Sequence, residues 1–115
     1  MALSLEAFSI ESSYESAHKK SLKNEKILLV FLVQKECNEC TKELRKILRD
    51  PVIDEVISDK AVFTIVTQGQ NESYPIELLF TQEYPSLFFL DKHELYKCDA
   101  LYGTIVVEKI QECLE

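Results

Sequence analysis

ILLVFLVQKECNEC, residues 27–40, joins an uninterrupted apolar run to two cysteines that are separated by two residues. The run 27–33 shows no alternation of polar and apolar residues, which indicates a strand buried on both faces, as in the centre of a sheet covered by helices. A helical pattern begins at Cys37, and we expect this helix to run to Arg49. A cysteine pair at the junction of a buried strand and a helix is typical of dithiol–disulfide chemistry.

The two sulfurs occupy different positions on the expected helix. Cys40 recurs at helical spacing with Leu44, Ile47 and Leu48, so it should point toward the core, whereas Cys37 should be exposed at the helix tip. A helix N-terminus favours a thiolate, so we expect Cys37 to attack and Cys40 to resolve. The alternative is a cysteine pair that only packs or chelates. The charged residues fall largely on the opposite side of this helix: Lys42, Glu43, Arg45, Lys46 and Arg49.

Length and composition predict an ordinary globular protein. The 115 residues are enough for one domain, residues 1–115, with a real core, and 46% are hydrophobic. The net charge is −7 and no run of Lys or Arg stands out, so we expect no nucleic-acid partner. Residues 1–10 lack a signal-peptide pattern, and 27–33 is too short to span a bilayer. We therefore expect no membrane association and a cytoplasmic location, or a periplasmic one if a signal segment has been removed.

The rest of the chain predicts alternating helices and strands. Helices are expected from the Ser12-Ser13 cap to about Ser21, from Val52 to Ile57 after Asp50-Pro51, from Pro75 to Gln82, and after a Gly103-Thr104 cap. Strands are expected at 61–66, at 86–90 after Pro85, and at 95–99 after a hairpin turn at 91–94. The order predicts an α/β domain of three layers with a mixed sheet. Inward-facing side chains are expected at Tyr14, Ala17, Leu22, Ile76, Leu79, Phe80, Val106, Ile110, Cys113 and Leu114.

At this point the chain resembles the thioredoxin-fold proteins over nearly its whole length. Tyr84-Pro85 stands before an apolar strand, where that family carries its cis-proline, and Gly103 stands before the last helix. Within the fold, the chain is most similar to thioredoxin-related proteins that have a Tyr…Ala helix, a Cys-x-x-Cys motif and an Asp-Pro-x-Val element. The resemblance implies a three-layer thioredoxin-like fold with a central mixed β-sheet flanked by helices. The corresponding residues are Tyr14 and Ala17, Cys37 with Cys40, and Asp50-Pro51-Val52-Ile53.

The motif departs from the family pattern at three places. Glu36 replaces the aromatic residue that usually precedes the first cysteine, and Asn38 and Glu39 replace the usual small pair. Phe31 occupies the position at which thioredoxins carry a buried acid, six residues before the first cysteine. The carboxylate that would help deprotonate the resolving thiol is therefore absent.

The charges around Cys37 are mixed. Lys35 and Lys42 favour its thiolate, whereas Glu36 and Glu39 oppose it at similar range. The helix dipole tips this balance toward the thiolate, so we expect a moderately activated thiol. The acidic motif should also discourage acidic substrates.

The resemblance implies thiol–disulfide exchange with protein disulfides. Cys37 would attack a substrate disulfide, and Cys40 would release the reduced substrate from the mixed disulfide. Pro85, if cis, would place its flanking backbone against the motif, where Tyr84 and Ser86 could hydrogen-bond a substrate chain as an added strand. The implied partners are protein disulfides and an upstream thiol reductant or oxidant. We expect a monomer and no cofactor.

Two further cysteines lie outside the motif. Cys98 and Cys113 fall on apolar faces of the last expected strand and helix, where a buried free cysteine behaves as a small hydrophobe. We expect both to be free. The alternative is a second disulfide between them, or redox sensing.

Two other functions stay open at this level. The first is a redox-inactive adaptor, because the aromatic residue and the buried acid are missing. The second is a soft-metal carrier, since paired thiolates suit Cu(I). His18 and His93 lie far from the motif in sequence and no second ligand pair has zinc spacing, so we expect no metal site. Tyr74, Phe80 and Tyr84 are either core residues or an exposed rim that suits a protein partner.

Overall fold

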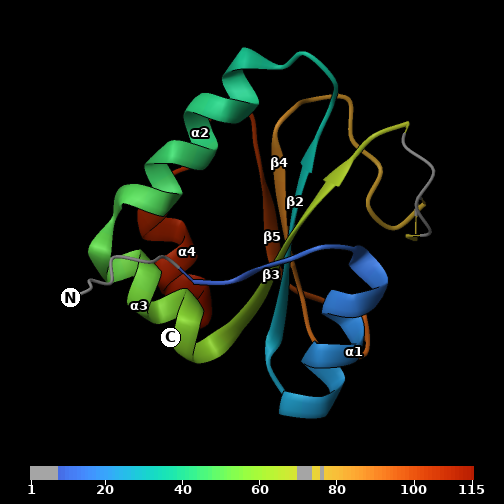
Figure 1. Ribbon diagram of the computed structural model, residues 1–115, viewed down its shortest axis with the longest axis vertical. Coiled ribbons are helices and arrows are strands. Elements are labelled where there is room, and N and C mark those ends of the chain that lie inside the picture. Colours follow the sequence, from blue (N-terminus) through green and yellow to red (C-terminus); the bar gives the residue numbers. More distant parts are fainter. Residues whose placement is uncertain (1–7, 70–73, 76) are drawn as a thin grey trace.

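The computed structural model describes residues 8–69, 74–75 and 77–115 of the chain. A sheet separates two helical layers, with α2, α3 and α4 on one face and α1 on the other (Figure 1). The predicted three-layer α/β architecture is confirmed. The elements in chain order are β1 (Ile10–Glu11), α1 (Tyr14–Asn24), β2 (Ile27–Val33), α2 (Asn38–Arg49), α3 (Pro51–Lys60), β3 (Ala61–Thr67), β4 (Ser86–Leu90), β5 (Tyr96–Tyr102) and α4 (Val107–Leu114).

The sheet is mixed, with the strand order β1-β3-β2-β4-β5. β3 pairs in parallel with β1 and β2, whereas β4 pairs antiparallel with β2 and β5. The central position of β2 explains its uninterrupted apolar sequence, because alternate side chains enter opposite cores. Leu28, Val30 and Leu32 pack on the α1 side, and Leu29 and Phe31 pack on the side of α2, α3 and α4.

Side-chain caps set the ends of the helices near the motif. Asp50 ends α2 and begins α3, because its Oδ1 accepts hydrogen bonds from the backbone N–H groups of Val52 and Ile53 at 3.0 and 3.1 Å. Pro51 then stands in the first turn of α3, where its missing N–H costs nothing. The structure extends α3 to Lys60, three residues beyond the expected end at Ile57.

The expected helix 75–82 is wrong in the part that the structure describes. Residues 77–79 form a turn, Leu79 is buried as predicted, and the side chain of Phe80 is 65% exposed instead of inward. Ile76 lies outside the described residues. The segment that follows is held by local bonds instead: Thr81 Oγ1 accepts from the N–H of Glu83 at 3.0 Å. A few apolar residues at helical spacing over so short a segment cannot distinguish a helix from an isolated turn, which is why the prediction of a helix was wrong.

Smaller corrections concern the ends of elements. The strand β1 had no counterpart in the expected order, and β5 continues to Tyr102 instead of ending at residue 99. α4 begins at Val107, so Val106 is its N-cap and is 45% exposed, not a core residue. Leu22 is 44% exposed, and Ser21 takes the buried position on α1, where its hydroxyl donates to the carbonyl of Lys26 at 2.6 Å. Among the described residues, none of the helices has the length and apolarity needed to cross a bilayer.

Candidate functional site

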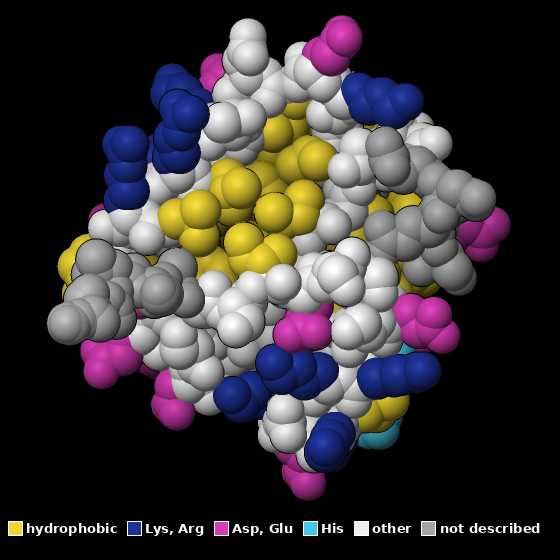
Figure 2. Space-filling view, viewed as in Figure 1, with side chains coloured by type: hydrophobic (Ala, Val, Ile, Leu, Met, Phe, Trp, Pro, Cys, Tyr) yellow, Lys and Arg dark blue, Asp and Glu magenta, His cyan; other side chains and the backbone are white. Residues whose placement is uncertain are grey.

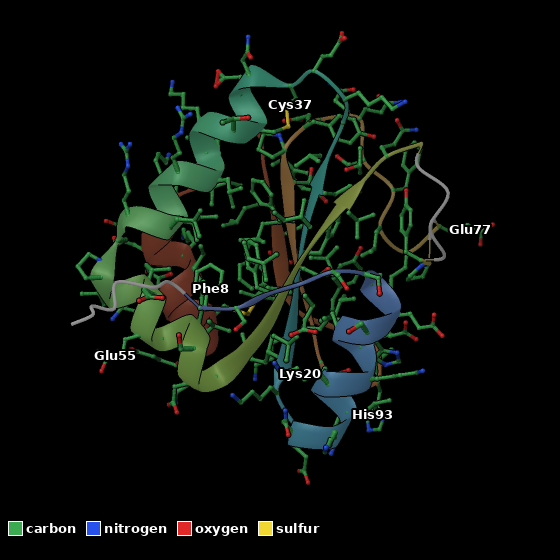
Figure 3. All side chains as sticks on the ribbon, in the orientation of Figure 1. Phe8, Lys20, Cys37, Glu55, Glu77 and His93 are labelled. Atoms are coloured by element: carbon green, nitrogen blue, oxygen red, sulfur yellow. A yellow bond between two sulfur atoms is a disulfide. The ribbon has the colours of Figure 1, made fainter. Side chains whose placement is uncertain are left out.

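Cys37 lies beyond the carboxyl end of β2, at the start of α2 (Figure 3), and Cys40 lies in the first turn of α2. Cys37 is the N-cap of α2, and its Sγ accepts a hydrogen bond from the backbone N–H of Cys40 at 3.0 Å. The two sulfurs form a disulfide. As predicted, Cys40 faces the core and is 5% exposed. Cys37 lies at the helix tip but is half-buried, not exposed as expected. A partner can therefore reach the first sulfur more readily than the second.

The residues that flank the cysteines are exposed and carry opposite charges. Glu36 adopts a left-handed conformation, with φ of 54°, in the turn that leads from β2 to the helix. Lys35 and Asn38 are exposed. Glu39 lies 3.9 Å from the Nζ of Lys42 in a solvent-exposed ion pair, so these two charges offset each other beside the motif.

Pro85 lies at the same end of the sheet as the motif. The Tyr84–Pro85 peptide bond is cis, as expected from the sequence. Leu32 near the end of β2 is paired with Ser86 at the start of β4, so the chain just before Ser86 lies beside the chain that leads into the motif. The carbonyl of Pro85 accepts a hydrogen bond from Gly103 N–H at 2.8 Å.

The three residues predicted to contact substrate are not equivalent in the structure. Ser86 is fully buried with strand partners on both sides, and its hydroxyl donates to the carbonyl of Glu83 at 2.6 Å. Tyr84 is half-buried and precedes the strand. The backbone of Ser86 lies inside the sheet, whereas that of Tyr84 lies before the first residue of β4.

Glu43 is a site residue that the sequence analysis placed on the wrong side of α2. Its side chain is 5% exposed. Its Oε1 accepts a hydrogen bond from the N–H of Ile105 at 2.9 Å and forms an ion pair with the Nζ of Lys46 at 2.7 Å. Burial acts to raise the pKa of Glu43, but the bonds from Lys46 and Ile105 outweigh it and hold this pKa below its usual value. The spacing of Cys40, Glu43 and Ile47 was the available signal, because these positions share one helical face.

A short segment between β5 and α4 joins the two sides of the site. Gly103 donates to Pro85, and two residues later Ile105 donates to Glu43 on α2. Gly103 itself has φ of +70°, a conformation that glycine adopts without strain. The loop of Pro85 and the helix of the motif are thus tied to one connector.

Cys98 and Cys113 are not free, which corrects the favoured interpretation of the sequence. They form a disulfide between β5 and α4, the alternative that the sequence left open. Both side chains are half-buried against the core on the side of α2. The sequence alone could not distinguish two free cysteines from a disulfide. Cysteines 15 residues apart on a strand and a helix meet only if the connector between these elements folds back.

A hollow of about 330 Å³ with a mixed polar and apolar lining opens beside the motif. Its lining includes both cysteines and side chains from three elements. Phe31 and Ile65, paired across β2 and β3, form part of it, and the position of the missing acid is occupied by the fully buried apolar side chain of Phe31. Figure 2 shows apolar side chains at the surface between α2 and the sheet. The apolar residues of the lining are Phe31, Val33, Leu44 and Ile65.

The histidines take no part in this site. His18 Nε2 lies 2.9 Å from the carbonyl of Lys92, and Glu94 accepts a hydrogen bond of 2.6 Å from Tyr14, so these contacts join α1 to the β4–β5 turn. His93 lies at the far end of the molecule from Cys37 (Figure 3). Within residues 8–69, 74–75 and 77–115, no group of three or more His, Cys, Asp or Glu side chains is arranged to hold a metal ion.

Comparisons with known proteins agree with this fold. The thioredoxin-like family matches residues 9–92. A putative disulphide-isomerase from Bacteroides thetaiotaomicron superposes with a TM-score of 0.77 at 16% identity, over 98% of each chain. A DsbH oxidoreductase gives a TM-score of 0.72 at 17% identity, over 99% of this chain and 90% of the other. A thioredoxin from Thermus thermophilus gives 0.71 at 16% identity, over 93% and 85%. No curated protein sequence matches the chain.

Proposed function

This chain belongs to the thioredoxin-like family, and from that premise we propose that it is a thiol–disulfide oxidoreductase that acts on protein disulfides through Cys37 and Cys40. The fold and the Cys-x-x-Cys pair support a redox role in general. The observation that carries the specific proposal is the unequal placement of the two sulfurs. Cys37 is half-buried at the N-terminus of α2, whereas Cys40 is 5% exposed and one helical turn behind it.

The exchange proceeds in two balanced steps. In the first step, the thiolate of Cys37 attacks one sulfur of a substrate disulfide; the substrate S–S bond breaks, one substrate thiolate leaves, and a mixed disulfide forms. In the second step, the thiolate of Cys40 attacks the Sγ of Cys37 and expels the other substrate thiolate. Two electrons have passed to the substrate, and the Cys37–Cys40 disulfide remains, as in the structure. An upstream dithiol reverses the sequence on the protein.

The environment of Cys37 supports its role as the attacking group. The N-terminus of α2 carries a partial positive charge that favours a thiolate, and the N–H of Cys40 is directed at the sulfur of Cys37 at 3.0 Å. Glu36 opposes this effect, and Glu39 is offset by Lys42. Tyr84, next to Pro85, supplies the backbone that would bind the substrate chain.

Insulin reduction by dithiothreitol tests the proposal. The protein should accelerate the reaction, and Cys37→Ser should abolish the acceleration. Reduced Cys40→Ser, freed of dithiothreitol and mixed with insulin, should accumulate a mixed disulfide because the resolving thiol is missing. The double variant Cys98→Ser/Cys113→Ser is the matched control and should retain activity. A wild-type rate equal to that of dithiothreitol alone, with no trapped species for Cys40→Ser, would contradict the proposal.

A reduction potential assigns the direction of electron flow. A value near that of thioredoxin, about −270 mV, indicates a reductase, and one near that of DsbA, about −120 mV, indicates an oxidase. The second candidate function is a redox-inactive binding module, which is favoured by the buried apolar side chain of Phe31 at the position of the missing acid. That module would show no exchange in either direction.

A further inference from the structure

We propose that the hollow beside the motif binds an apolar side chain of the substrate, and that a row of cations on α2 binds acidic residues further along the same extended chain. This inference rests on the proposed function and names its substrate class. The class consists of polypeptide segments with an apolar residue next to the reacting cysteine and acidic residues about four to five positions away.

The hollow is in direct contact with the reacting group. Both motif cysteines line it, so a substrate joined to Cys37 has its neighbouring residues at the opening. Phe31 from β2, Leu44 from α2 and Ile65 from β3 form the apolar part of its lining, and the polar residues Gln34, Glu36, Asn38 and Thr41 form the rest together with the cysteines and Val33. Phe31 is fully buried, so the lining is continuous with the core. The volume of about 330 Å³ accommodates a large apolar side chain, and removing one from water is favourable.

The cations form one side of α2. Lys42, Arg45 and Arg49 follow each other at spacings of three and four residues, which places them on the same exposed helical stripe. Among the described residues, the ion pairs include Lys42 with Glu39 but neither Arg45 nor Arg49. Figure 2 shows Lys and Arg side chains along α2, beside the apolar surface. These two guanidinium groups are available to a carboxylate from outside.

The spacing of acidic residues in the substrate follows from the helix. With a rise of about 1.5 Å per residue, Arg45 lies roughly 12 Å and Arg49 roughly 18 Å along the axis from Cys37. An extended chain covers these distances in about four to five residues at 3.3 Å per residue. Glu36 and Glu39 disfavour a substrate carboxylate immediately beside the cysteine. Repulsion by the acidic motif and attraction by the cations of α2 together favour substrates whose acidic residues stand away from the reacting cysteine and not next to it.

Four synthetic peptides and the Cys40→Ser variant test the inference. Each peptide carries one cysteine as a mixed disulfide with thionitrobenzoate, so attack by Cys37 forms the peptide–protein disulfide and releases coloured thionitrobenzoate. The peptides combine Leu or Ser next to the cysteine with Glu or Lys at the fourth and fifth positions beyond it. The Leu/Glu peptide should react about tenfold faster than the Ser/Glu peptide. It should react about threefold faster than the Leu/Lys peptide, and only this second difference should disappear in 1 M NaCl.

Two charge-matched variants identify the surface. Arg45→Glu/Arg49→Glu should reverse the preference for Glu over Lys peptides and leave the preference for Leu intact. Lys19→Glu/Lys23→Glu makes the same change in net charge on α1, on the opposite face of the sheet, and should leave both preferences as they are. Ile65→Thr, on β3 in the lining of the hollow, should reduce the preference for Leu. Ile27→Thr, at the end of β2 far from the motif, should not.

The outcomes separate this inference from the proposed function. Equal rates for the four peptides, each well above that of a free thiol, would overturn the inference and leave the exchange activity standing. The same equal rates would follow if a second copy of the chain occupied the hollow. A Cys40→Ser variant that reacts with no peptide and no small disulfide would overturn the proposed function itself.

Discussion

Glu43 on α2 accepts a 2.9 Å hydrogen bond from the backbone N–H of Ile105, a residue 62 positions away that is fully buried. The bond fixes the connector before α4 to the helix that begins at the motif. Since Gly103 in the same connector donates to Pro85, the relative positions of the motif and the Pro85 loop depend on it. A carboxylate buried one turn after Cys40 is therefore a structural group of the site.

Replacing Glu43 should destabilise the protein by an amount that depends on what remains for Ile105. Glu43→Ala leaves the buried N–H without an acceptor and should lower the free energy of unfolding by about 2–3 kcal/mol. Glu43→Gln keeps an acceptor but loses the ion pair with Lys46, and should cost about 1 kcal/mol. Urea unfolding followed by circular dichroism measures both. Glu39→Ala, on the exposed side of α2, is the control and should change stability by no more than about 0.5 kcal/mol; an equal loss for Glu39→Ala and Glu43→Ala would contradict the role assigned to Ile105.

The same carboxylate makes stability depend on pH in acid. The pKa of Glu43 is lower in the folded protein than in the unfolded chain, where it is about 4.3. Its contribution is therefore complete above about pH 4.3 and is lost as the pH falls through the folded pKa. The difference in unfolding free energy between the wild type and Glu43→Gln should be constant from pH 7 to 5 and should shrink below about pH 4. Urea midpoints at each pH test this, and a difference that stays constant down to pH 3 would exclude the linkage.

The sequence predicted the parts of the fold that depend on local signals. The apolar run 27–33 matches β2 residue for residue, and Asp50-Pro51 ends one helix and starts the next as expected. The burial of Cys40 could be predicted because its helical spacing with Ile47 is a strong periodic signal. The expected helix 75–82 failed because a short segment with two or three apolar residues carries no reliable period.

Contacts between distant residues were beyond the sequence. Whether Cys98 and Cys113 bond depends on how the connector 103–106 folds back, and burial of Glu43 depends on an N–H that another element presents. Both are tertiary effects that override a local pattern. A carboxylate among cations on a helix is usually a solvated ion pair; the spacing of Glu43 with Cys40 and Ile47 indicated the buried face, and the N–H of Ile105 supplies the partner that the sequence does not show.

The Cys98–Cys113 disulfide should stabilise α4 on the sheet. Closing a loop of this length constrains the unfolded chain by about 3 kcal/mol in the chain-entropy treatment, so Cys98→Ser/Cys113→Ser should lose about that much. The amide of Ile105, inside this loop, should exchange its hydrogen faster in the variant. Urea unfolding and hydrogen exchange under oxidising conditions measure the two effects. Cys37→Ser/Cys40→Ser opens a much shorter loop and should cost less; the reverse order would show that the bond to α4 does not carry this stability.

Alkylation should distinguish the four cysteines once both disulfides are reduced. Cys37 is half-buried at a helix N-terminus that favours its thiolate, and Cys40 is 5% exposed. Cys98 and Cys113 pack against the core away from a helix N-terminus. Limiting iodoacetamide, followed by mass mapping, should therefore label Cys37 first in the folded protein. The same reagent in urea should label all four at similar rates, because unfolding removes the differences in burial and in helix dipole. Labelling of Cys98 or Cys113 as fast as Cys37 in the folded protein would mean that the helix N-terminus does not activate the motif.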